Sequence, residues 1–340
     1  MIDSSNRSFN RRDFLSATSI VGAAALLGLS RSAAGEPPPE TTRIRLVKNP
    51  AICLSPEYIA EEFLRLEGFS QIEYVETDVL YTIDILHDDR ADFTVVSAPD
   101  FLTWVEAGRS IVALSGIHGG CYELFANDRI RAIRELKGKR VAVISLGKSP
   151  EYFYVASMVA YVGMDPRKDI HWIEGHTFDK TMQLFVDGKV DAFLGFPPQP
   201  QELRRKKIGR VIVNTAQDRP WDQYYCCMIA SRPQFVKSHP VAAKRATRAI
   251  LKATDLCARE PERAARYIVA KGYEPSYEVA LEVLKSLSYN RWRTHDPEDS
   301  LRFFGVRLHE AGLIKTSPQK LISQGTDWRF LNELKKELKA

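Results

Sequence analysis

A four-residue sequence, Ser-Pro-Glu-Tyr, occurs twice in the chain, at 55–58 and at 149–152. Each copy follows a short apolar stretch, 44–47 in the first case and 140–144 in the second, which is typical of a buried strand. Serine is a favoured N-cap and proline suits the first helical position, so each copy predicts the start of a helix. Two such strand-to-helix units, 94 residues apart, predict two similar α/β lobes whose strand ends face each other across a cleft. Serine-proline is also a common helix opener without a ligand, as we expect at Ser317-Pro318.

Strand and helix patterns alternate along both expected lobes, which favours an α/β fold with mainly parallel sheets. The expected strands are 44–47, 72–75, 93–96 and 111–116 in the first lobe, and 140–144, 170–173, 192–194 and 211–213 in the second. The helices expected between them are 56–67, 79–87 and 99–106, then 150–162, 178–186 and 198–206. After Ser231 the pattern is helical, over 241–259, 261–270, 277–286, 298–311 and 330–339, and these helices should pack back on the first lobe.

The chain is expected to cross between the lobes twice, through His118 to Ala126 and through Gln223 to Ile229. We therefore assign residues 43–121 and 229–340 to lobe 1 and residues 122–228 to lobe 2.

The first 34 residues are expected to be an export signal and not part of the fold. Ser8-Phe9-Asn10-Arg11-Arg12 resembles the twin-arginine signal, the run 16–29 is mildly apolar, and Ser32-Ala33-Ala34 resembles a cleavage site. A membrane anchor is the alternative, but the apolar run is short and rich in alanine and glycine. We predict export to the periplasm by the twin-arginine machinery, cleavage near Ala34, and a leader over 35–42.

Composition excludes some classes of partner and site. The 48 basic and 43 acidic residues nearly balance, and no basic run carries interleaved aromatic residues, so we expect no nucleic-acid partner. The five cysteines show no CxxC or Cys/His metal spacing, which predicts no metal site and no disulfide framework. A bond between the adjacent Cys226 and Cys227 would be strained. We expect Cys121 and Cys226 to be small buried hydrophobic side chains.

The helix 241–259 carries a basic stripe, formed by Lys244, Arg245, Arg248 and Lys252. We interpret this stripe as a solvated face, with a docking surface as the alternative.

Ligands of open α/β sheets bind outside the carboxyl ends of the strands, and this rule selects the candidate binding residues. They are Ser55, Tyr58, Ser97, His118, Gly119, Gly120, Ser145, Gly147, Lys148, Ser149, Tyr152, Phe196 and Tyr224. The helix starts at Ser55 and Ser149, with the Lys148 ammonium, should hold an anionic or carbonyl-bearing group, while Phe196 and Tyr224 enclose an apolar part. His118 is either a ligand contact or a hydrogen-bonded loop residue.

Sequence motifs of common enzyme classes are missing. The chain has no G-x-S-x-G elbow, no P-loop and no dinucleotide-binding fingerprint. We therefore expect no catalytic residues and no cofactor.

Several segments together resemble the periplasmic solute-binding proteins of ABC importers, in the group that includes alkanesulfonate, nitrate and thiamine-pyrimidine binders. The resemblance rests on Arg43–Val47 followed by Ser55-Pro56, on 136–143, on 190–198 and on the helical C-terminal part. It implies a type II periplasmic binding fold of two lobes joined by two crossing strands, with a small organic or anionic solute (sulfonate, nitrate, pyrimidine or related) enclosed by hinge closure. It also implies delivery to an ABC permease in the inner membrane, and we expect the protein to act as a monomer.

A related branch of this fold is enzymatic and makes the thiamine pyrimidine with a cysteine-rich motif. Cys226-Cys227 lies in a vaguely similar place, but the motif is not reproduced, and the chain has the features of an exported protein. An enzyme of this kind remains the alternative function, and the sequence leaves the identity of the solute open.

Overall fold

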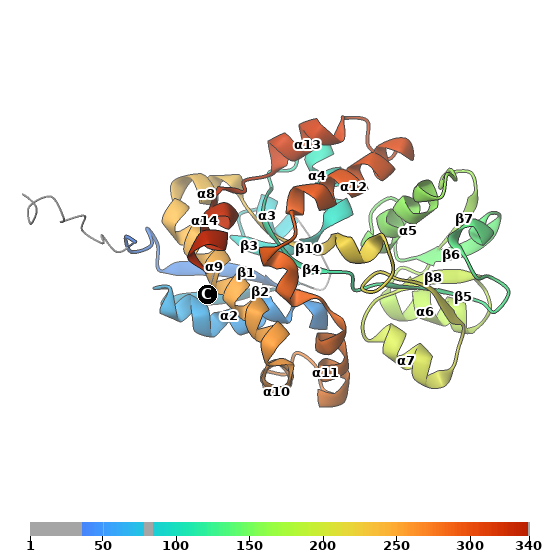
Figure 1. Cartoon of the computed structure of the whole chain (residues 1–340), viewed down its shortest axis with the longest axis horizontal. Helices are drawn as coiled ribbons and strands as arrows, with labels where there is room; N and C mark the ends of the chain where they lie inside the picture. The colour runs from blue at the N-terminus through green and yellow to red at the C-terminus, as the bar shows by residue number, and fades with distance from the viewer. Residues whose placement is uncertain (1–35, 50, 78–83, 339–340) are drawn as a thin grey trace, which may run out of the picture. The chain divides into compact units, whose positions relative to one another are not determined.

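The computed structural model describes residues 36–338 apart from 50 and 78–83, and from Pro39 onward the chain forms one compact unit. Within these residues it contains two five-stranded sheets, each with its own helices (Figure 1). The predicted α/β class with two lobes is confirmed. The predicted signal, residues 1–34, lies outside the described part of the chain, as do most residues of the predicted helix 79–87.

The first sheet defines lobe 1 and has the strand order β2-β1-β3-β10-β4. Its strands are β1 (Arg43–Lys48), β2 (Gln71–Glu76), β3 (Phe93–Ser97), β4 (Val112–Gly119) and β10 (Tyr225–Ser231). The strand β1 pairs in parallel with β2 and β3, whereas β10 pairs antiparallel with both β3 and β4. The returning strand β10 therefore enters the middle of the sheet and separates β4 from the rest.

The second sheet defines lobe 2 and has the order β7-β6-β8-β5-β9. Its strands are β5 (Glu123–Ala126), β6 (Lys139–Val143), β7 (Ile170–Glu174), β8 (Ala192–Gly195) and β9 (Arg210–Asn214). The strand β6 is parallel to β7 and β8, and β5 is antiparallel to β8 and β9. The expectation of mainly parallel sheets is thus met for only half of the strand pairs, because each sheet contains one strand that arrives from the other lobe in the opposite direction.

Helices follow the strands in both lobes as the sequence pattern predicts. Lobe 1 contains η1 (Ile52–Leu54), α2 (Ser55–Leu66), α3 (Asp84–His87) and α4 (Ala98–Glu106), and lobe 2 contains η2 (Ile133–Leu136), α5 (Pro150–Tyr161), α6 (Phe178–Val186) and α7 (Gln199–Lys206). The predicted starts hold to within one residue, apart from the start expected at residue 79, which lies outside the described residues, but the capping of the helices differs. The Ser149 hydroxyl does not cap α5 and accepts a hydrogen bond from the Ser145 N–H at 3.2 Å, while Ser55 donates to the Ile52 carbonyl at 2.5 Å.

The chain after β10 is helical, as expected, and Figure 1 shows these orange and red helices beside the strands and helices of lobe 1. They are α8 (Pro233–Ser238), α9 (Pro240–Arg259), α10 (Pro261–Ala270), α11 (Tyr277–Ser286), α12 (Pro297–Glu310), α13 (Pro318–Gly325) and α14 (Arg329–Glu337), with η3 (Trp221–Gln223) before β10 and η4 (Tyr289–Arg293) before α12. The short helix α8 was not predicted, and α13 begins at the expected Ser317-Pro318. Among the described residues, none of these helices combines the length and apolar character needed to cross a membrane.

The basic stripe of α9 is not a solvated face, so that prediction is wrong. The helix packs against α2, and Arg248 and Lys252 reach the Glu67 carboxylate at 2.7 and 2.9 Å. Lys244 bridges to Glu333 and Glu337 on α14. The Arg248 and Lys244 side chains are only 11% and 14% exposed, because the stripe faces two other helices.

Candidate functional site

In three of the described helices, a proline at the start is followed by an acidic residue that is buried. Glu57 on α2, Asp100 on α4 and Glu151 on α5 all lie in a first helical turn, and all three are buried. A carboxylate in the first turn complements the partial positive charge of a helix N-terminus. The helix starts at Ser55 and Ser149, which were expected to attract an anionic ligand, therefore already hold carboxyl groups of their own.

Asp100 and Glu151 bring one carboxyl group from each lobe into the same electrostatic environment. Their helices, α4 and α5, pack against each other. Burial raises the pKa of Asp100 well above its usual value, and the Glu151 charge raises it further. Burial raises the pKa of Glu151 to about 7, against smaller opposing effects of its own N–H and the Ser149 hydroxyl. Near neutral pH the two groups therefore hold less than two negative charges between them.

The carboxyl pair has unused hydrogen-bonding capacity. The Ser97 hydroxyl donates to Oδ2 of Asp100. In the described part of the chain, Asp100 Oδ1, both Glu151 carboxyl oxygens and the Tyr122 hydroxyl have no hydrogen-bond partner of ordinary geometry. Burying a polar group unpaired costs about 1–3 kcal/mol. These atoms would therefore be stabilised by a molecule that brings N–H or O–H donors between the lobes.

An aromatic wall lies beside the carboxyl pair. It consists of Phe196, Tyr122, Tyr154 and Phe304, with ring centroids 5.3, 4.8 and 5.1 Å apart along that order. Tyr154 also donates a hydrogen bond to the Cys226 carbonyl at 3.3 Å. Phe304 belongs to α12, one of the C-terminal helices. Tyr154 and Phe196 belong to lobe 2, and Tyr122 belongs to the first crossing. The wall therefore contains residues from both lobes.

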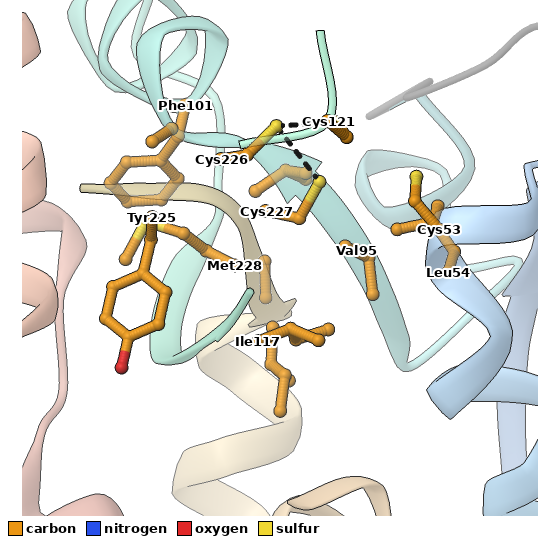
Figure 2. Close-up of a cluster of buried hydrophobic side chains, with 14 of the residues drawn as sticks. Cys53, Leu54, Val95, Phe101, Ile117, Cys121, Tyr225, Cys226, Cys227 and Met228 are labelled. Carbon is orange, nitrogen blue, oxygen red and sulfur yellow. Dashed lines mark hydrogen bonds between the residues drawn. The ribbon is translucent and has the colours of Figure 1, made fainter. Parts of the chain in front are cut away.

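A second constellation, which we call the thiol–imidazole cluster, consists of Cys53, His118, Cys121 and Cys227. One ligand atom from each residue lies within 4.8 Å of all the others, and all four residues are buried. Figure 2 shows the neighbouring sulfur atoms of Cys121, Cys226 and Cys227 turned toward one another, with Cys53 on a separate segment. The Cys121 and Cys226 sulfur atoms are 2.9 Å apart. Spacing rules missed this cluster because its members come from η1, β4, the first crossing and β10.

Within this cluster, the Cys227 thiol and the His118 imidazole shift each other's pKa. Burial opposes ionisation of Cys227, but hydrogen bonds from Cys121 and Cys226 outweigh it and lower the thiol pKa. Burial likewise opposes protonation of His118, but the neighbouring Cys227 raises the imidazole pKa. Each of the two groups therefore favours the charged form of the other.

Two of the predicted binding residues lie at this cluster. In the antiparallel ladders Cys227 is directly opposite Ser97 on β3 and His118 on β4, so the three residues form one row across three strands. Gly119 and Gly120 follow His118 and have a packing function: a Cβ on Gly120 would lie 2.1 Å from the Thr215 carbonyl carbon. Their lack of side chains lets the first crossing pass close to Thr215 and, at Gly119, to Tyr224 of the second crossing.

Other predicted residues are packed within a lobe or against the C-terminal helices. Tyr58 stacks on Tyr273 with ring centroids 3.9 Å apart, and Tyr224 stacks on Phe303 at the same separation. Tyr152 packs edge-on against Trp172 at 4.9 Å. Phe196, in contrast, is part of the aromatic wall.

The loop 145–149 does not contribute its predicted cation to the buried groups. Gly147 and Lys148 are exposed, and the Ser145 hydroxyl donates to Glu174 at 3.3 Å. The backbone N–H of Leu146 binds the same Glu174 carboxylate at 2.7 Å, and the Lys148 charge helps to lower the pKa of that carboxyl group. The candidate residues that sequence reasoning missed are Asp100, Glu151, Tyr122, Cys53, Cys121 and Cys227. The glutamate of the repeated Ser-Pro-Glu-Tyr was an available signal for Glu151.

The sequence profile of the family described as NMT1/THI5 like matches residues 58–264. The chain belongs to the NMT1/THI5-like family. This membership confirms the resemblance derived from the sequence. A search of curated proteins finds no match for this NMT1/THI5-like chain.

Solved structures share its fold at low sequence identity. The periplasmic nitrate-binding protein NrtA from Synechocystis PCC 6803 superposes with a TM-score of 0.71 and 15% identity, covering 89% of this chain and 90% of NrtA. The alkanesulfonate-binding protein SsuA from Xanthomonas axonopodis pv. citri, bound to MOPS, gives 0.67 and 14%, covering 87% and 100%. SsuA from Escherichia coli gives 0.64 and 14%, covering 84% and 92%. The two lobes are therefore those of the periplasmic binding protein fold.

Proposed function

We propose that this NMT1/THI5-like protein is an exported solute-binding protein of an ABC importer. It encloses a small molecule between its lobes and releases it unchanged to a permease in the inner membrane. The fold and the family support this function, and so does the position of Asp100 and Glu151, which face each other from opposite lobes. A ligand held by both groups would favour the closed arrangement of the lobes, because each lobe supplies part of its binding energy.

Among the three expected solute classes, the site favours a nitrogen-bearing ring over sulfonate or nitrate. The observation that carries this choice is the buried carboxyl pair, together with the exposed position of Lys148. An anion would be repelled by carboxylates, whereas an aminopyrimidine offers a ring nitrogen and an adjacent N–H in the geometry that a carboxyl group binds with two hydrogen bonds. The aromatic wall would pack against the ring face.

Binding measurements on the full chain test this choice. Titration calorimetry with a 4-aminopyrimidine, nitrate and a short alkanesulfonate should show binding of the first and none of the anions. Asp100→Asn and Glu151→Gln should each weaken binding about 10- to 100-fold, the loss typical of a charge-assisted hydrogen bond. Lys148→Ala is the matched control and should bind like the wild type. Tight binding of an anion that depends on Lys148 would refute the proposal.

The natural solute can be identified from the purified protein. Mass spectrometry of small molecules released on denaturation should reveal one nitrogen-bearing compound that rebinds unaltered. If the protein converts that compound chemically, or retains a cofactor, the enzymatic alternative is correct and the transport function is wrong.

Export can be tested separately from binding. Replacing Arg11 and Arg12 by lysine should leave the protein in the cytoplasm, whereas the wild-type chain should appear in the periplasmic fraction, cleaved near Ala34. Periplasmic accumulation of the double variant would contradict the twin-arginine route. A sedimentation measurement should give a monomer.

A further inference from the structure

The thiol–imidazole cluster lies where the two crossings meet the sheet of lobe 1, and it does not include Asp100 or Glu151. Cys53 ends a turn of η1 and His118 lies near the end of β4, while Cys121 and Cys227 belong to the first and second crossings. Buried cysteines alone are commonly just small hydrophobic side chains. That interpretation does not account for a fully buried imidazole among them, because the solvation lost by its ring nitrogens must be replaced.

The orientation of His118 is that of a metal ligand. Its Nδ1 lies 3.2 Å from the Gly119 carbonyl oxygen, a contact that requires the hydrogen on Nδ1. Nε2 is then the nitrogen left to bind a metal: it makes no hydrogen bond of ordinary geometry within the described residues, it lies near the Cys227 thiol, and it offers a lone pair once its own proton is displaced. A histidine that binds a metal through one nitrogen commonly donates its other N–H to a backbone carbonyl in this way.

The surroundings fix the other ligands in place. The Tyr289 hydroxyl donates to the Cys53 carbonyl at 2.8 Å, and its ring packs edge-on against the His118 imidazole at 5.3 Å. The direct pairing of Cys227 with His118 across two strands places both side chains on one face of the sheet. Three of the four ligands are therefore positioned by the sheet ladder or by Tyr289.

We propose that Cys53, His118, Cys121 and Cys227 form a tetrahedral binding site for a thiophilic divalent cation, Zn²⁺. Three sulfurs and one nitrogen are the ligands of a closed structural zinc site. In such a site the ligand atoms lie about 3.5 to 3.8 Å from one another, because zinc binds sulfur at about 2.3 Å and nitrogen at about 2.0 Å. The present limit of 4.8 Å requires small side-chain movements inward. None of the four ligands belongs to the carboxyl pair proposed to hold the solute.

The bound cation would connect η1 of lobe 1 to both crossings. Because the crossings form the hinge of this fold, the cation would restrict the hinge without contacting the carboxyl pair. Cys226 is the one neighbouring thiol outside the set: its sulfur lies 2.9 Å from that of Cys121 and 3.6 Å from that of Cys227. It provides both a control and the competing outcome, a Cys121–Cys226 disulfide.

The test uses the full chain, purified without chelators and kept reduced, with Zn²⁺ and Co²⁺ as probes. Elemental analysis should find one zinc per chain, and Co²⁺ should give the visible absorption of tetrahedral thiolate coordination. X-ray absorption of the wild-type zinc complex should count three sulfur ligands and one nitrogen, a result that needs no variant to fold. Binding without this ligand count would overturn the proposal.

Variants assign the ligands. Cys53→Ser, His118→Gln and Cys227→Ser should each weaken zinc binding by at least the roughly 10- to 100-fold that loss of an outer-shell partner costs. Cys226→Ser and Cys257→Ser are matched controls and should bind zinc like the wild type. Circular dichroism verifies that each variant is folded. Equal affinity in all variants, or peptide mapping that shows a Cys121–Cys226 disulfide in the isolated protein, would refute the site.

Discussion

Glu151 illustrates how a single residue can change the expected charge of a buried site. The sequence pattern emphasised the serine, the proline and the neighbouring Lys148, and these residues do open a helix. The lysine is exposed, however, while the glutamate is buried against Asp100 and Tyr122. Whether a side chain at a helix start points inward depends on how the two lobes meet, and local sequence does not encode that.

Glu151 should make the protein less stable as the pH rises. Burial raises its pKa from 4.5 to about 7, so the folded state retains a proton that the unfolded state has lost between these values. Stability is therefore fully present below pH 4.5 and declines by about 3 kcal/mol up to pH 7. The groups facing Glu151 are Asp100, Tyr122 and Ser149, and Asp100, whose pKa is also raised, adds a decline of the same sign.

Urea unfolding at several pH values measures this effect. Glu151→Gln should remove part of the decline, so the stability difference between wild type and variant should change with pH. Glu262→Gln is the control, because Glu262 is paired with Lys285 near the surface and its pKa is lowered. Parallel pH curves for wild type and Glu151→Gln would show that Glu151 ionises normally.

At the scale of elements, the order of strands and helices was predictable and their partners were not. Short apolar stretches and proline starts located nearly every strand and helix, because both signals are local. The basic stripe on α9 was misinterpreted because the contacts that bury it are not local. Its charges are neutralised by Glu67 at the end of α2 and by residues of α14, which are distant in sequence. The thiol–imidazole cluster was missed for the same reason.

The ion pair between α9 and α2 should be important for stability. Arg248→Met leaves the buried Glu67 carboxylate with Lys252 as a weaker partner, and should lower the free energy of unfolding by about 3 kcal/mol. Arg263→Met on α10 is the control, since its pairs with Glu62 and Glu260 are half exposed, and it should cost under about 1 kcal/mol. Chemical denaturation measures both, and equal losses would contradict the buried arrangement.

The first crossing should tolerate little added bulk where Gly120 passes Thr215, the residue that follows β9. Gly120 has a φ of +34°, and an added Cβ would lie 2.1 Å from backbone atoms of Thr215. Gly120→Ala should therefore cost about 3 kcal/mol. Gly138→Ala is matched in conformation, with a φ of +69° and open space around the Cβ, and should cost about 1 kcal/mol. A similar loss for both variants in thermal unfolding would mean that the first crossing moves away from Thr215 easily.

At the scale of the whole molecule, solute and stability should be coupled. The closed lobes bury Asp100, Glu151 and the aromatic wall, so a solute that binds between them binds the folded state alone. At a hundred times its dissociation constant it should add about 2.7 kcal/mol to the free energy of unfolding. The melting temperature should then rise by about 5 °C or more, measured by calorimetry. Glu151→Gln should lose most of this shift, and a full shift in that variant would place the solute elsewhere.

The position of β10 in the first sheet determines the order in which the chain can fold during synthesis. Every described strand or bridge partner of β4 lies later in the chain: β10, Ser288 and Thr326. Lobe 2 can complete its sheet with strands β5 to β9 alone, all of which are made before β10. On the ribosome, β4 must therefore wait with both edges unpaired until lobe 2 has emerged, and an unpaired edge is prone to aggregation. Lobe 1 is synthesised first and completed last.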